Sequence, residues 1–136
     1  MKTLDLSKDE YGWISVGYDD LVESFAEIVD STDCGSYRGD LVFALRSETG
    51  EPGILVCGYG SCSGCDALQA CGDNPNAITA LRNSIAEDVV WGKHNIENHD
   101  WAGEWVLYDR CVRAAIYDYT VKFGFTPPFS READDE

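Results

Sequence analysis

Cysteines are concentrated in one short, glycine-rich stretch of the chain. Cys57, Cys62, Cys65 and Cys71 follow the spacing C-x4-C-x2-C-x5-C. Four thiolates complete a tetrahedral zinc site, and C-x2-C is the usual half of such a site. Cys62 and Cys65 form the stronger half, because the outer two lie in an apolar run and at a predicted helix end, where each can simply fill a small buried space. The spacing predicts zinc as the candidate cofactor, with all four cysteines as candidate ligands.

The same cysteines are compatible with two other kinds of chemistry. A strand that leads into Cys62-Ser63-Gly64-Cys65 at the start of a helix favours the thiolate, as in thiol-redox proteins. Asp66 opposes thiolate formation, and the strand belongs to a hairpin instead of the βαβ unit of thioredoxin-like folds. The first three cysteines also match the spacing of plant-type iron–sulfur ligands, for which Cys111 would supply the fourth thiolate.

The segment Gly58–Asp66, named here the glycine–cysteine loop, has two further interpretations that do not involve its thiols: a phosphate-binding loop and a structural turn. Its glycines resemble a phosphate-cradling loop, but the spacing differs from the dinucleotide fingerprint, and no lysine or arginine occurs between Arg46 and Arg82. As a structural turn, the loop would use the conformational freedom of glycine, and Ser61 or Ser63 would cap the next helix. The candidate binding positions are the side chains of Tyr59, Ser61, Ser63 and Asp66.

Outside this loop, the sequence lacks an arrangement typical of catalysis. His94 and His99 are five residues apart and do not share one helical face, so solvated or hydrogen-bonded histidines are favoured. Trp91, Trp101 and Trp105 are expected to be buried around a tight turn. No Ser/His/Asp order or nucleophile elbow occurs, which favours a protein without enzymatic activity.

The net charge of −15 is distributed over both flanks of the loop. Residues 1–34 hold nine acids and two bases, residues 83–136 hold eleven acids and five bases, and residues 35–82 are nearly neutral. A field of this sign repels phosphate backbones and so disfavours direct nucleic-acid binding. It instead steers the protein toward basic surfaces, including the nucleic-acid grooves of other proteins. A simple role in solubility is the alternative.

Composition and the first residues indicate a globular protein of the cytoplasm. The 136 residues are 44% hydrophobic and 26% charged, which is ordinary for one folded domain. No stretch approaches the roughly 20 apolar residues that cross a bilayer, so no membrane partner is expected. The segment Met1–Glu10 lacks the apolar region of a signal peptide. In a cytoplasmic chain, six cysteines favour free thiols, metal ligation or redox chemistry over disulfides.

Hydrophobic periodicity and turn residues predict an α+β fold. Two β-type runs, 41–46 and 54–59, flank a cluster of turn residues and indicate a hairpin. Shorter strands are expected over 13–16 and 105–108. Helices are expected over 20–31, 66–71, 75–91, 96–99 and 109–123.

The order of these elements predicts a small antiparallel sheet of three or four strands, packed on one face against about three helices. We expect a single domain over residues 1–126, followed by a flexible acidic C-terminal tail over residues 127–136.

The combination of Gly39-Asp40, the hairpin, the segment Gly58–Leu68 and the later segment His99–Gly103 resembles a group of small acidic proteins encoded by bacteriophages. The resemblance covers roughly residues 11–110, and its specific part is the glycine–cysteine loop. It implies expression in the cytoplasm of a bacterial host, where small acidic phage proteins often bind and inhibit host machinery. It implies no activity and no catalytic residues.

Charge and resemblance together favour a non-enzymatic protein that binds a basic surface of a host protein, such as a defence or nucleic-acid-processing factor. Carboxylates that occupy a basic groove, as in nucleic-acid mimicry, are one physical route to inhibition. The alternative is a small zinc or thiol-redox protein that acts through Cys62 and Cys65.

Overall fold

The computed structural model of the protein describes residues 1–35, 38–61, 66–103 and 105–132. Its elements are, in chain order, α1 (Tyr18–Glu23), β1 (Glu27–Gly35), β2 (Gly39–Arg46), β3 (Pro52–Tyr59), α2 (Ala67–Cys71), α3 (Pro75–Glu87), β4 (Val90–Trp91), α4 (Lys93–Asn98), a 3-10 helix η1 (Trp105–Tyr108) and α5 (Arg110–Lys122). The strands form one antiparallel sheet in the order β1-β2-β3-β4. The predicted α+β class is confirmed.

The centre of the sheet is the predicted hairpin of β2 and β3. The two strands pair along their full length, from Gly39 opposite Tyr59 to Arg46 opposite Pro52. A tight turn over residues 47–51 joins them, because its serine, threonine and glycine residues favour a chain reversal. This hairpin carries the glycine–cysteine loop at its far end.

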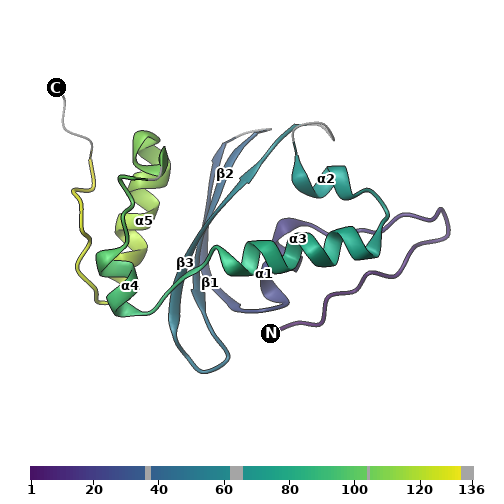
Figure 1. The fold of residues 1–136 in the computed structure, drawn as a ribbon, viewed down its shortest axis with the longest axis horizontal. Helices are drawn as coiled ribbons and strands as arrows, with labels where there is room; N and C mark the ends of the chain where they lie inside the picture. The colour runs from purple at the N-terminus through teal and green to yellow at the C-terminus, as the bar shows by residue number, and fades with distance from the viewer. Residues whose placement is uncertain (36–37, 62–65, 104, 133–136) are drawn as a thin grey trace.

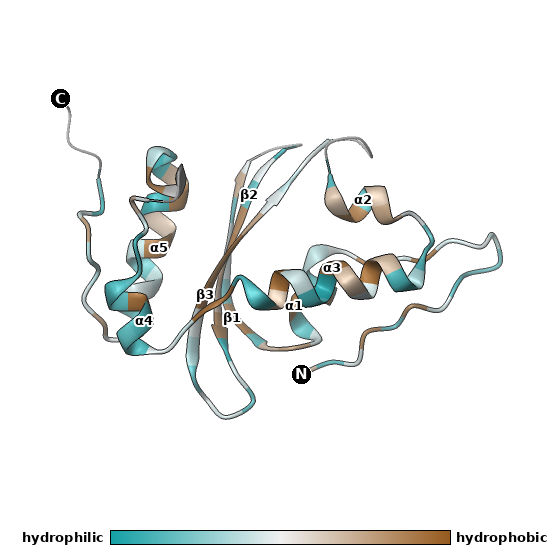
Figure 2. Ribbon diagram, viewed as in Figure 1, coloured by the Kyte–Doolittle hydropathy of each residue, from teal (hydrophilic) through white to brown (hydrophobic). Residues whose placement is uncertain are grey.

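Helices cover both faces of the sheet, as Figure 1 shows edge-on. On one face, named here the α3 face, Phe43, Leu45 and Leu55 pack against α1 and α3. On the other, the α5 face, Val42 and Ile54 pack against α4 and α5. The central strands are hydrophobic between these two layers (Figure 2). The expectation that one face is covered was therefore wrong, because β2 and β3 bear apolar side chains on both sides.

The predicted helix over 20–31 is divided between two elements. Helix α1 ends at Glu23, and β1 begins four residues later. Leu21 and Val22 are buried as predicted, but the following β-branched residues pair with β2 across the sheet. Such residues favour a pleated surface, and long-range pairing overrides a helical apolar pattern here.

Smaller differences concern the ends of other elements. The predicted strand over 13–16 is a single bridge between Lys8 and Ile14. Residues 105–108 form η1 instead of a strand, and α3 ends at Glu87. The starts of α3 and α5 agree with the sequence, because the side chains of Asn74 and Asp109 accept hydrogen bonds from backbone N–H groups of the first turn.

One glycine is required by the packing of β3 against β4. A Cβ atom at Gly53 would lie 2.5 Å from the ring of Trp91 and 2.9 Å from the side chain of Val89. The aromatic ring therefore occupies the space that any larger residue would need.

Alternate side chains of β1 are bonded to α5. These bonds, named here the β1–α5 seam, are formed by the pairs Asp30–Lys122, Thr32–Tyr119 and Cys34–Cys111. The first is an ion pair of 3.1 Å, the second a hydrogen bond between hydroxyl groups and the third a disulfide. The three strand residues are two apart and therefore point to the same side of β1, and their partners on α5 are three and eight residues apart, about one and two helical turns.

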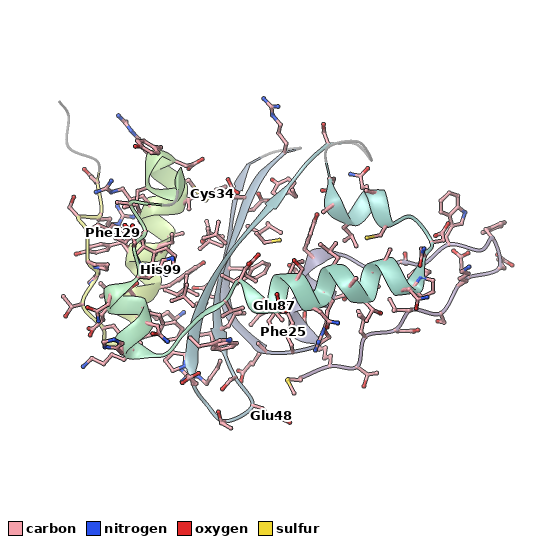
Figure 3. All side chains as sticks on the ribbon, viewed as in Figure 1. Phe25, Cys34, Glu48, Glu87, His99 and Phe129 are labelled. Atoms are coloured by element: carbon pink, nitrogen blue, oxygen red, sulfur yellow. A yellow bond between two sulfur atoms is a disulfide. The ribbon has the colours of Figure 1, made fainter. Side chains whose placement is uncertain are left out.

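The disulfide contradicts the preference for free thiols, metal ligation or redox chemistry over disulfides at two of the six cysteines, whereas Cys57 and Cys71 are free thiols. Cys34 and Cys111 are 77 residues apart in the sequence, but their Cα atoms lie 5.6 Å apart. Cys34 lies at the end of the sheet away from Glu48, which marks the hairpin tip, and on the side of α5 (Figure 3). Because Cys111 is bonded to Cys34, it does not supply a fourth iron–sulfur ligand in this structure.

After α5 the chain returns along the same helix. Arg131 forms a two-pronged ion pair with Asp118, with N–O distances of 2.9 and 3.1 Å. Arg113 donates a hydrogen bond of 2.7 Å to the carbonyl of Ser130. These contacts attach Ser130 and Arg131 to α5, and flexibility of the acidic tail over residues 127–136 stays a prediction. Within the described ranges, none of the helices combines the length and the apolar composition of a bilayer span.

Candidate functional site

The glycine–cysteine loop lies between β3 and α2, at the end of the sheet away from the hairpin turn. Tyr59 is the last residue of β3, and Asp66 immediately precedes α2. Cys62, Ser63 and Cys65 are outside the described residues, so the predictions that rest on them stay predictions. The flanks of the loop are described and show what holds it.

Asp66 is the centre of the hydrogen bonds around the loop. Its carboxylate accepts from the backbone N–H of Gly60 at 2.8 Å, the N–H of Gln69 at 2.9 Å and the hydroxyl of Tyr18 at 2.9 Å. Burial alone would raise the pKa of Asp66, but these donors outweigh it and lower the pKa below its usual value. The side chain is 5% exposed. It therefore connects the loop, α1 and α2.

This arrangement changes the predicted role of the serines. The N-cap of α2 is Asp66, through its bond to Gln69, and not Ser61 or Ser63. Asp66 was predicted as a binding residue from its place in the loop. Its hydrogen bonds to Gly60, Gln69 and Tyr18 show that it positions its neighbours, and its role in binding stays a prediction.

Cys57 and Cys71, the first and last cysteines of the predicted zinc site, are poorly suited to thiolate chemistry. Burial and, to a smaller extent, the nearby carboxylates of Asp66 and Asp40 raise the pKa of Cys57 to about 12. The thiol of Cys71, whose pKa is also raised by burial, donates to the carbonyl of Ala67 at 3.3 Å. In the part of the chain that the structure describes, no group of three or more His, Cys, Asp or Glu residues could hold a metal ion. Elemental analysis of protein purified without chelator tests the zinc prediction directly.

A cleft of about 470 Å³ opens on the α3 face beside the loop. Its walls come from the N-terminal segment, the start of α1, the ends of β1, β2 and β3 near the loop, α2 and the start of α3. Leu41, Leu68 and Ile78 provide apolar surface at its base. Two of the four predicted binding residues, Tyr59 and Asp66, line it, and Ser61 is not among its lining residues. The volume is in the range of small-ligand and side-chain pockets.

The N-terminal wall of the cleft is a turn organised by Asp9. Its carboxylate accepts from the backbone N–H groups of Tyr11 and Trp13, and Gly12 between them has a φ of +83°, which favours glycine. The N–H of Ile14 then donates to the carboxylate of Asp73 at 3.0 Å, which attaches this wall to the residues after α2. Sequence reasoning missed this wall.

The cleft is acidic as well as apolar. Its described lining includes Asp33, Asp66 and Asp73, and it includes no lysine, arginine or histidine. The hydroxyl of Tyr59 donates to Asp33 at 2.6 Å, and this bond, with burial and the charge of Asp33, raises the pKa of Tyr59 to about 12. Tyr59 therefore stays neutral at physiological pH and orients the carboxylate at the rim.

A second, more polar hollow of about 680 Å³ lies between α3, β4 and α4. His94 and His99 both line it, although their sequence spacing suggested separate faces. His94 is near the side-chain amide of Asn98, and the ring of His99 meets that of Trp101 edge-on with centroids 4.4 Å apart. These contacts position the two rings, and His99 lies close to α4 in Figure 3.

The arrangement of the first cleft is suited to binding. Its carboxylates are held by internal donors, and its remaining walls are aromatic and aliphatic. Comparison of the chain with protein-family models, with curated proteins and with solved structures finds no match.

Proposed function

We propose that the protein is a non-enzymatic acidic binding protein that engages a basic surface of a host protein and modulates it. The observation that carries the proposal is the excess of acids over bases, 25 to 10. Several bases are already engaged within the chain, because Lys2, Lys122 and Arg131 form ion pairs with acids. The excess carboxylates therefore give the surface a strongly negative field, which attracts basic partners.

The engaged arginines strengthen this argument. Arg82 donates from its Nε to the hydroxyl of Ser24 at 2.9 Å and lies over the ring of Phe25. Arg113 is held between Ser130 and the ring of Phe129. These cations stabilise contacts between elements.

The partner in this proposal is a defence or nucleic-acid-processing factor of a bacterial host. Such proteins bear basic grooves for phosphate backbones, and a carboxylate-rich surface can occupy a groove of that kind. The same field opposes direct binding of nucleic acid by this chain. The resemblance to small acidic bacteriophage proteins supports the host context and an inhibitory outcome.

The test is capture of a partner from a bacterial lysate, followed by affinity measurements with the purified partner over a range of salt. Salt screens the attraction between opposite charges, so we expect the affinity to fall steeply as salt increases. A captured partner with an acidic surface, or an affinity that does not change with salt, would contradict the proposal.

We further propose that the protein acts in the host cytoplasm. Disulfides form in oxidising compartments and are rare in the cytosol, so the state of Cys34 and Cys111 in cells bears on this point. Alkylation of free thiols in freshly lysed cells, followed by mass spectrometry, measures it. A fully oxidised pair in every sample would count against cytoplasmic residence.

A further inference from the structure

We infer that the cleft beside the glycine–cysteine loop binds a guanidinium group, namely an arginine side chain on the surface of the partner. The inference rests on the proposed function and names the place at which the basic partner docks. Three properties of the described walls support it: apolar depth, exposed aromatic surface and carboxylates at the rim.

The depth of the cleft suits the aliphatic part of a long side chain. Leu41, Leu68 and Ile78 come from β2, α2 and α3 and form a continuous apolar base. Ile78 is 1% exposed, so the base is part of the core. Arginine buries its methylene groups against such surface while its charged end stays near the opening.

Aromatic side chains line the cleft as well. Trp13 is 62% exposed and stands on the Asp9 turn, so its surface is available to a partner. Tyr18 and Tyr59 also line the cleft, and each is oriented by a hydrogen bond to an aspartate. A planar cation stacks on aromatic rings and is attracted by their π electrons, most strongly by tryptophan.

Carboxylates supply the opposite charge. Asp33 and Asp73 each use Oδ1 to accept one internal hydrogen bond, from Tyr59 and from Ile14 respectively. No described residue donates to the Oδ2 atom of either. These fixed side chains therefore keep acceptor capacity for an incoming donor.

The combination favours arginine over other occupants. A neutral apolar group would leave the negative charge of the carboxylates uncompensated, and a phosphate or carboxylate would be repelled by it. Lysine satisfies the charge, but its compact ammonium is more strongly hydrated and does not stack on rings.

The first test uses peptides alone, without any host protein. A fluorescein-labelled glycine-flanked peptide with two arginines is titrated with the protein, and fluorescence anisotropy measures its affinity. Matched peptides carry citrulline, which keeps the shape without the charge, or lysine, which keeps the charge without the plane. We expect affinity in the order arginine, lysine, citrulline. Equal affinity for the arginine and citrulline peptides overturns the inference.

NMR locates the bound peptide on the ¹⁵N-labelled protein. The amides of Ile14, Gly60 and Gln69 lie in the walls, so they should show the largest chemical-shift changes. Changes spread over the acidic surface, with none concentrated at these amides, would overturn the assignment of the site.

Two variants and two controls separate cleft binding from general charge attraction. Trp13→Ala should lower the affinity about tenfold and Asp33→Asn about threefold, and the asparagine still accepts the bond from Tyr59. Tyr108→Ala removes an aromatic ring that is 87% exposed elsewhere, and Glu48→Gln removes one exposed charge at the hairpin tip (Figure 3). Both controls should stay within about twofold. Equal losses in Asp33→Asn and Glu48→Gln, with no loss in Trp13→Ala, mean that only net charge matters and overturn the inference.

The two proposals can fail separately. If the peptide shows no preference for the cleft but a host partner binds in a salt-dependent manner, the arginine site is wrong and the proposed function stands. If the cleft selects arginine but no basic host protein is captured, the function is wrong and the site stands. Loss of partner binding in Trp13→Ala and Asp33→Asn, but not in the controls, supports both.

Discussion

The two faces of the sheet are closed in different ways. On the α5 face, a disulfide, a hydrogen bond and an ion pair connect β1 directly to α5, and these contacts join residues that are 77 to 92 positions apart in the sequence. On the α3 face, the polar contacts around the loop converge on the single carboxylate of Asp66. The α5 face is bonded along the length of a strand, whereas on the α3 face the hydrogen bonds beside the glycine–cysteine loop centre on Asp66 and a cleft lies next to them.

This difference indicates a division between stability and recognition. Covalent and long-range contacts on the α5 face limit the motion of the helix against the sheet. On the α3 face, apolar and aromatic surface stays accessible at the cleft, and an exposed patch of this kind typically marks a binding site. Each prediction below removes a contact from one face, beginning with the largest expected effect.

Removal of the disulfide should weaken the α5 face most. The variant Cys34→Ala/Cys111→Ala releases a loop closed over 77 residues, which should lower the free energy of unfolding by about 4 kcal/mol because the unfolded chain gains entropy. Urea unfolding monitored by circular dichroism measures this change. Reductant should shift the wild-type protein to the same midpoint and leave the variant unchanged. If the disulfide variant, under conditions in which it is folded, binds the arginine peptide as tightly as the wild type, then the disulfide on the α5 face does not affect binding on the α3 face.

Loss of the Asp66 carboxylate should be the most damaging single change on the α3 face. Asp66→Ala leaves the N–H groups of Gly60 and Gln69 and the hydroxyl of Tyr18 without their acceptor, at a cost of about 3 kcal/mol. Asp66→Asn keeps one oxygen and should cost less than half of this. Urea unfolding compares the three proteins, and equal stability of wild type and Asp66→Ala would disprove the central role of this carboxylate.

The pKa of Asp66 adds a dependence on pH. Because the pKa is lowered in the folded state, the carboxylate contributes stability above its unfolded value of about 3.9, and this contribution is lost as the pH falls through the folded pKa. The stability difference between wild type and Asp66→Asn should therefore shrink below about pH 4. Unfolding curves between pH 7 and pH 2.5 test this, and a difference that grows toward acid would contradict the sign of the shift.

A smaller effect is expected for the hydrogen bond in the middle of the β1–α5 seam. Tyr119→Phe removes the partner of the Thr32 hydroxyl and leaves the ring in the core, so the cost should be about 1 kcal/mol. Tyr117→Phe, on the same helix, is the matched control. A loss as large as that of the disulfide variant would mean that this bond, and not the covalent one, dominates the seam.

The smallest effect is expected for the ion pair at the end of the seam. The side chains of Lys122 and Asp30 are 48% and 47% exposed, so solvent and salt screen their attraction. Lys122→Met should change the free energy of unfolding by less than about 0.5 kcal/mol. A thermal unfolding scan at low and high salt measures it, and a large loss at both would contradict this ranking.

Sequence signals that act within a few residues predicted some elements correctly, whereas the elements that were not predicted depend on long-range contacts. Asn74-Pro75 marks the start of α3, and the turn residues after Arg46 mark the hairpin, because these signals act within a few residues. The apolar spacing after Leu21 suits a helix, but pairing with β2 makes β1 from its second half. Nothing near Cys34 in the sequence indicates Cys111 as its partner, since only the fold brings β1 and α5 together.

The cleft was difficult to predict for the same reason. Tyr59 and Asp66 were selected because they lie in the glycine–cysteine loop, and both line the cleft. The other walls come from distant segments, including Trp13 and Leu41. Asp9 followed by Gly12 was an available signal, because an aspartate before a glycine is typical of a turn.

The disulfide also divides the chain into a covalent ring and two arms. Residues 34–111 form the ring. The N-terminal arm, residues 1–33, is joined to the ring covalently at the peptide bond before Cys34, and its other contacts with the ring are non-covalent. Trp13 lies on this arm, whereas Tyr59 and Leu68 belong to the ring. The cleft is therefore a joint between two topologically distinct parts of the chain, and an occupant that contacts both would clamp the arm to the ring.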